Sequence, residues 1–207
     1  MVTDAYSSQY LYNIESVDMN RPSIQPGDEL ILTSPNEDSF SVDGRLVIVI
    51  DLFCGEYKGS ISYQYFPANI DLHNFPLEKR IISKDGTGEI IVLYALLSNA
   101  MEAHLEIELL TNDKSSVNVH GVVAASTSKI LHPPFSSMVF LKKPSFGINV
   151  GHKEQIPLSR SVVAVPYESV LYIDFHLVDN DDNDVVEGCV AFDAKPGSEP
   201  VLVYGWS

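Results

Sequence analysis

The sequence predicts an all-β fold: an antiparallel β-sandwich of about ten to twelve strands with at most one short helix. Two features indicate this class. Most segments alternate apolar and polar residues with a period of two, which is the pattern of a strand with one buried face. Between these segments lie turn-forming stretches such as 84–88 (KDGTG) and 195–198 (KPGS), in which proline fixes φ and glycine accepts positive φ.

The predicted strands are short and occur along the whole chain. They cover residues 29–33, 45–53, 60–66, 78–83, 89–95, 102–111, 116–125, 138–141, 159–165, 170–178, 187–192 and 200–206. The clearest alternation lies in 102–111, where one face takes apolar residues (Leu105, Ile107 and Leu109) and the other takes polar ones (His104, Glu106 and Glu108). The run 45–53 is apolar nearly throughout, which favours an interior strand covered on both faces.

The segment 93–101 (LYALLSNAM) is the one place where the sequence suggests a helix. No repeat, low-complexity tract or long linker divides the 207 residues, of which 45% are hydrophobic. That apolar content is enough for one well-buried core. We therefore predict a single β-sandwich domain over 1–207.

The charge and the cysteines limit the partners and the compartment. A formal net charge of −15 repels phosphate backbones, so no nucleic acid partner is expected. No apolar run is long enough to span a bilayer, so no membrane partner is expected. Cys54 and Cys189 both lie in apolar runs, which predicts two buried thiols in a reducing compartment rather than a disulfide. Because signal-peptide and Asn-x-Ser/Thr patterns are also absent, we expect a cytoplasmic location.

The motifs of common enzyme classes are missing, and we predict that the chain is not an enzyme. The nucleophile elbow, the His-Glu-x-x-His zinc motif, the phosphate-binding loop and the dinucleotide fingerprint do not occur. His104 and Glu106 match half of a zinc deaminase signature, but the Pro-Cys-x-x-Cys half is missing. A Cys–His nucleophile pair requires an accessible thiol, whereas both cysteines are expected in the core. No catalytic residue is assigned.

The sharpest local feature is the acidic stretch 179–184 (DNDDND), followed by Glu187. Calcium is bound by clustered oxygen atoms, so a calcium site is one interpretation, with Asp179, Asp181, Asp184 and Glu187 as its candidate ligands. The EF-hand pattern fails, because the glycine at its sixth position and the glutamate at its twelfth are missing. The alternative is a solvated turn between two strands, where Asp and Asn are favoured on turn grounds alone.

Several stretches resemble a known plant family. They are 10–35 (YLYNIESVDMNRPSIQPGDELILTSP) running into 45–59 (RLVIVIDLFCGEYKG), 117–130 (VNVHGVVAASTSKI), 156–175 (IPLSRSVVAVPYESVLYIDF) and the closing 201–207 (VLVYGWS). Together they resemble a grass-specific domain family of unknown function. Its members occur alone or fused to ribosome-inactivating (rRNA N-glycosidase) domains. The resemblance implies a plant protein with a defence connection.

The chain departs from that family in two places. Family members begin with an extra strand before an Ala-x-Arg-Asp element, whereas this chain opens at 1–4 (MVTD), where that strand would end. A truncated chain, a piece cut from a longer one, and a fold completed by a partner strand are the open explanations. In the last case the unpaired neighbour is a pairing edge. The cysteine that the family carries beside an N-terminal Gln is Met19 or Asn20 here.

The resemblance does not imply toxin catalysis. An rRNA N-glycosidase needs a Glu and an Arg one helical turn apart, and the nearest imitation, 101–104 (MEAH), has no Arg. The first hypothesis is therefore a non-catalytic binding module that contacts a protein through a sheet face, an exposed strand edge or apical loops. Self-association through such an edge belongs to the same hypothesis. The alternatives are a lectin-like domain with Tyr and Asp at its loop ends, and an unrecognised hydrolase with paired carboxylates.

Overall fold

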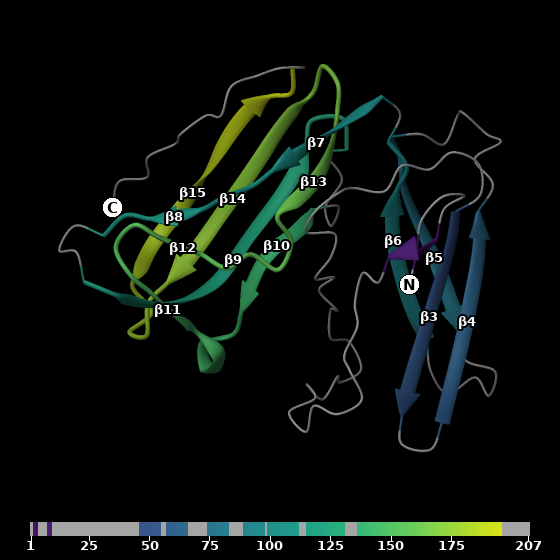
Figure 1. The fold of residues 1–207 in the computed structure, drawn as a ribbon, viewed down its shortest axis with the longest axis horizontal. Helices are drawn as coiled ribbons and strands as arrows, with labels where there is room; N and C mark the ends of the chain where they lie inside the picture. Colours follow the sequence, from purple (N-terminus) through teal and green to yellow (C-terminus); the bar gives the residue numbers. More distant parts are fainter. Residues whose placement is uncertain are drawn as a thin grey trace.

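The computed structural model describes residues 2–3, 8–9, 46–54, 57–65, 74–82, 89–97, 99–111, 115–130 and 136–195 (Figure 1). Apart from the 3₁₀ turn η2 (Pro144–Phe146), all regular structure in these ranges is strand. Fifteen strands are present there, and four of them have only two residues, which leaves eleven longer ones. The predicted all-β class is confirmed. Within the same ranges, no helix is long and apolar enough to cross a membrane.

The strands of the first half form two small antiparallel sheets. They are β1 (Val2–Thr3), β2 (Ser8–Gln9), β3 (Leu46–Cys54), β4 (Tyr57–Tyr65), β5 (Pro76–Ile82) and β6 (Glu89–Ala95). Four of them pair in the order β2-β1-β3-β4, and β5 pairs with β6 as a hairpin. β3 therefore lies inside its sheet, as its apolar sequence predicts.

The strands of the second half form a sandwich. They are β7 (Ala100–His104), β8 (Glu108–Leu109), β9 (Val117–Thr127), β10 (Ser137–Lys142), β11 (Ile148–Val150), β12 (Glu154–Gln155), β13 (Val162–Pro166), β14 (Val170–Val178) and β15 (Asp184–Asp193). One layer is a five-stranded sheet in the order β10-β9-β14-β15, with β11 also paired to β9. The other layer is narrower and consists of the pairs β7–β13 and β8–β12. Figure 1 shows β7 and β8 crossing the face of β14 and β15.

The core lies between these two layers. Val119, Val123 and Phe140 of the wide sheet are fully buried, and Val163 and Val165 of β13 pack in the same cluster. The alternation predicted for 170–178 is confirmed, because its apolar residues lie in the cluster or pack against it while alternate positions face outward. Burial of this continuous apolar interior is the main stabilising contribution to the sandwich.

One rim of the sandwich is closed by a loop. The pairing of β10 with β9 shifts between Met138 and Phe140, which marks a β-bulge at Val139. The carbonyl oxygen of Val139 accepts hydrogen bonds from the backbone N–H groups of Ser159 (2.8 Å) and Arg160 (3.4 Å). The loop between β12 and β13 thus joins the narrow layer to the edge of the wide one.

Gly121 shows why a glycine is required inside β9. Its φ is +124°, a conformation that L side chains rarely adopt. A Cβ atom at this position would also clash with the backbone carbonyl oxygen of His176 on β14. The close approach of the two central strands therefore depends on the missing side chain.

Most of the predicted strands in the described ranges are found, and 89–95 and 170–178 keep their predicted bounds. The prediction of one strand over 102–111 is wrong: β7 ends at His104 and β8 begins at Glu108. The helix suggested over 93–101 is wrong as well, because β6 runs to Ala95 and β7 begins at Ala100. The strands predicted at 29–33 and 200–206 lie outside the described residues.

Candidate interaction site at the edge of β7 and β8

Residues 100–109, here called the edge strand, are paired along one side. β7 pairs with β13, and β8 pairs with β12. The link between them keeps to the same side, because the Leu105 N–H donates to the Ser161 carbonyl (2.7 Å) and the Ile107 carbonyl accepts from the Ile156 N–H (2.8 Å). Every second residue of a strand directs its N–H and C=O to the opposite side.

The other side of the edge strand carries the backbone groups of His104, Glu106 and Glu108. Among the described residues, β7 pairs only with β13 and β8 only with β12, so no strand pairs along this second side. Unpaired N–H and C=O groups in a row are a template for adding another strand. The edge strand is therefore an open pairing edge within the described part of the chain.

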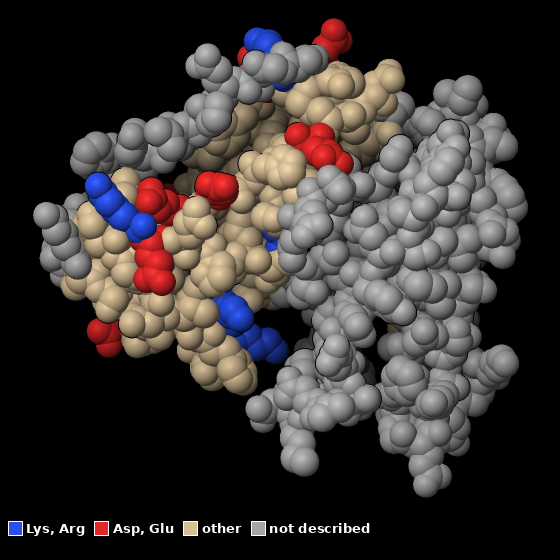
Figure 2. Space-filling view, in the orientation of Figure 1, with Lys and Arg blue, Asp and Glu red and all other residues tan. Residues whose placement is uncertain are grey.

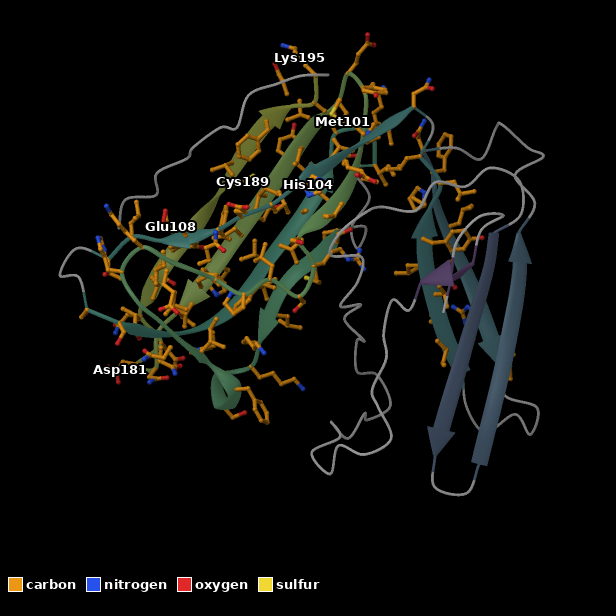
Figure 3. All side chains as sticks on the ribbon, viewed as in Figure 1. Met101, His104, Glu108, Asp181, Cys189 and Lys195 are labelled. Atoms are coloured by element: carbon orange, nitrogen blue, oxygen red, sulfur yellow. The ribbon has the colours of Figure 1, made fainter. Side chains whose placement is uncertain are left out.

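The outward face of the edge strand is acidic. The side chains of Glu102, His104, Glu106 and Glu108 are all exposed, and Figure 3 shows His104 and Glu108 along the same strand. The His104 Nε2 lies 3.9 Å from the Glu102 carboxylate, and the Glu106 carboxylate accepts a long hydrogen bond of 3.5 Å from the Gln155 amide. Figure 2 shows acidic side chains gathered over β8 and β12.

The inward face of the edge strand is apolar and incompletely covered. Met101, Leu105 and Ile107 pack against the core cluster but remain half-buried. Val190 and Phe192, on the outermost strand of the wide sheet, are half-buried in the same way. Because the narrow layer is two strands wide and the wide layer is broader, apolar surface at this rim is left partly uncovered.

A shallow depression of about 390 Å³ lies on the paired side of the edge strand. It forms between Ile156 and Ser161, which are both hydrogen-bonded to the edge strand, because the chain between them leaves this pairing. Leu105, Ile107, Pro157 and Leu158 supply its apolar lining, and Glu106 and Gln155 its polar one. The departure of this loop explains why the predicted strand 102–111 is broken into β7 and β8.

The acidic stretch 179–184 forms the turn between β14 and β15. The Asp179 carboxylate accepts hydrogen bonds from the backbone N–H groups of Asp181 (2.8 Å) and Asn183 (2.9 Å) and from the Asn183 amide (3.0 Å). These bonds, first of all the one from the Asn183 side chain, lower the pKa of Asp179 below its ordinary value of 3.8. The carboxylate therefore stabilises the turn.

The other candidate calcium ligands point into solvent. Asp181, Asp184 and Glu187 are exposed, and Figure 3 shows Asp181 at the tip of the turn. Among the described residues, which include all four candidates, no three His, Cys, Asp or Glu side chains are arranged to hold a metal ion. The hydrogen bonds of Asp179 explain why Asp and Asn suit this turn, and the calcium site stays a prediction.

The prediction of two buried thiols is wrong for Cys189, which is exposed on β15 and forms no disulfide. The prediction relied on the apolar neighbours of Cys189 in the sequence. However, β15 is the outermost strand of the wide sheet, and Cys189 faces outward opposite Asp174. A side-chain hydrogen bond with Asp174, with a smaller contribution from burial, raises the pKa of the Cys189 thiol. Cys54 lies on β3, and its side chain is outside the described features.

Three polar side-chain atoms of the described residues are buried without a hydrogen-bond partner: the His120 Nδ1, the Thr127 Oγ1 and the Arg160 Nε. The His120 ring is 5% exposed, its Nε2 lies 3.7 Å from the Asp182 carboxylate, and its Nδ1 has no hydrogen-bond partner in the described residues. The Arg160 Nε is also buried without a partner in this part of the chain, and burial lowers the pKa of Arg160. The sequence did not predict this burial, because a single His, Thr or Arg in a strand or loop gives no signal of it.

Comparison with known proteins gives one match. The model of a family described as a domain of unknown function, DUF6598, matches residues 1–203. No curated protein and no solved structure matches the chain. The expected resemblance to a family of unknown function is confirmed, and the match runs through both the first-half sheets and the sandwich. The chain belongs to the DUF6598 family.

Proposed function

We propose that this chain is a non-catalytic interaction module that binds a protein partner by adding a strand to the edge strand. The observation that supports it is the open side of 100–109, toward which His104, Glu106 and Glu108 direct their backbone groups and along which no described strand pairs. An extended peptide binds such an edge through main-chain hydrogen bonds, and alternate side chains supply specificity.

The expected strength of this binding shows which groups must contribute. Three residues offer three N–H and three C=O groups, and six hydrogen bonds at about 1 kcal/mol each give about 6 kcal/mol. Association costs at least about 4 kcal/mol in lost freedom. Backbone pairing alone therefore leaves little net affinity, and the partner must also cover apolar surface. The half-buried Val190 and Phe192 on β15 provide that surface.

We also propose the kind of organism and the cellular compartment in which this module acts. The resemblance described above suggests a plant protein with a defence connection, in which this domain supplies binding rather than chemistry. An exposed free thiol at Cys189 suits a reducing compartment, which supports the cytoplasm as its location.

The test compares two substitutions at one position. Glu106→Pro removes an N–H on the open side and places a ring there, whereas Glu106→Ala keeps that N–H. Proline is tolerated at edge positions whose N–H faces solvent. Both variants and the unmodified chain are used as baits in quantitative pull-downs from grass leaf extract, with thermal unfolding as the folding control.

Strand addition predicts proteins that are enriched by the unmodified chain and by Glu106→Ala but lost with Glu106→Pro. Equal enrichment by a folded Glu106→Pro variant would remove the edge strand as the binding site. A bait that enriches nothing in any form would contradict the interaction module itself.

A further inference from the structure

We infer that the partner segment is an extended strand with Lys or Arg at every second position and apolar residues between them. This inference rests on the proposed function, because it describes the strand that the open edge accepts. It adds the chemistry of the partner, which the pairing geometry alone does not specify.

The outward side chains of the edge strand determine which charge is favourable on the outward face of the partner strand. Directly opposite side chains on neighbouring strands lie close together, and opposite charges stabilise such pairs while like charges destabilise them. Glu106 and Glu108 are exposed on this face, and Glu102 is exposed on the same row of the edge strand. An added strand therefore gains from basic residues on its outward face.

The same acidic residues disfavour a second copy of this chain. If two edge strands paired with each other, their outward rows of Glu102, His104, Glu106 and Glu108 would face one another with three carboxylates on each side. The net charge of −15 adds to that repulsion. A strand with basic residues on its outward face avoids both the repulsion between the carboxylate rows and the repulsion from the net charge.

The inward positions of the partner must be apolar. Alternate residues of an added strand point to the opposite face, which here is the interior side of the sandwich. The half-buried Val190 and Phe192 on β15, the outermost strand of the wide sheet, lie on this side. The complementary strand is thus basic on one face and apolar on the other.

Three synthetic nine-residue peptides test this inference. They share valine and threonine at alternate positions and carry Lys, Gln or Glu at the positions between. Binding to the full chain is measured by fluorescence anisotropy at physiological ionic strength. The protein variants are Glu106→Gln with Glu108→Gln, and a control with the same loss of charge elsewhere, Asp181→Asn with Glu187→Gln. Glu106→Pro and Glu106→Ala are included to report on strand addition.

We expect the Lys peptide to bind the unmodified chain more tightly than the Gln peptide, and the Glu peptide to bind most weakly. Loss of two cross-strand pairs in Glu106→Gln with Glu108→Gln should weaken the Lys peptide about fivefold. The control variant, Asp181→Asn with Glu187→Gln, should leave the affinity for the Lys peptide unchanged. Weaker binding of the Lys peptide to this control would indicate attraction to the overall charge of the chain and would overturn the inference.

Two further outcomes separate this inference from the proposed function. If all three peptides bind equally and Glu106→Pro abolishes their binding, strand addition stands and the basic partner is wrong. If the Lys peptide binds Glu106→Pro as tightly as Glu106→Ala, strand addition at this edge is wrong as well. Binding of none of the three peptides contradicts the basic, alternating partner.

Discussion

Proline substitutions at two neighbouring positions of the edge strand should have very different effects on the free energy of unfolding. The Leu105 N–H donates a 2.7 Å hydrogen bond to the Ser161 carbonyl, whereas no described group accepts from the Glu106 N–H. Losing the Leu105 bond costs about 1–3 kcal/mol, and truncating a half-buried leucine adds about 1 kcal/mol. We therefore expect Leu105→Pro to cost about 2–4 kcal/mol and Glu106→Pro to cost about 1 kcal/mol or less.

Urea unfolding followed by circular dichroism measures this difference. The slope of free energy against urea concentration should be similar in the two variants, so that the midpoints can be compared directly. If Glu106→Pro destabilises the chain as much as Leu105→Pro, the Glu106 N–H is already bonded in the folded chain. The edge would then be occupied before any partner arrives, and the argument for strand addition would be refuted.

Three more predictions concern the wide sheet and its turn. Gly121→Ala should destabilise the chain by about 3 kcal/mol or more in urea unfolding, since positive φ and a backbone clash act together; a stable variant would contradict the β9–β14 packing. Asp179 has a lowered pKa, so its stabilisation of the turn is present above pH 3.8 and is lost as pH falls through the folded pKa. Asn183→Ala should move the Asp179 pKa upward toward 3.8 in an NMR titration, and no movement would rule out the Asn183 bonds as the cause. Cys189 should react slowly with iodoacetamide and faster in Asp174→Ala, because that substitution removes the main cause of its raised pKa.

Local alternation predicted much of the sandwich from the sequence. In 170–178, every second residue is apolar and the strand lies inside a wide sheet, so the pattern and the observed burial agree. In 102–111, the alternation also predicts burial correctly, since Leu105 and Leu109 face inward while Glu106 and Glu108 are exposed. Periodicity reports which face of a strand is buried, and that information is local.

The open edge and the break at 105–107 could not be predicted in this way. Which side of a strand lacks a partner depends on segments distant in sequence, here β12 and β13. The cause of the break is the loop around Pro157, whose contact with Val139 exists only in the folded chain. Cys189 was misplaced for the same reason, because an apolar run on an outermost strand resembles one in a core strand.

The pairing of the edge strand with distant segments has a consequence for the order of folding. β14 and β15 are joined by a tight turn, so their pairing closes a short loop. His104, by contrast, pairs with Val162, a residue far from it in the sequence, and this pairing closes a long loop. Contacts between distant residues cost more loop-closure entropy and form later. The edge strand should therefore dock last and detach first, in local openings that leave the wide sheet intact. A bound partner would suppress those openings, so occupancy of the edge would protect this chain from proteolysis at its least stable element.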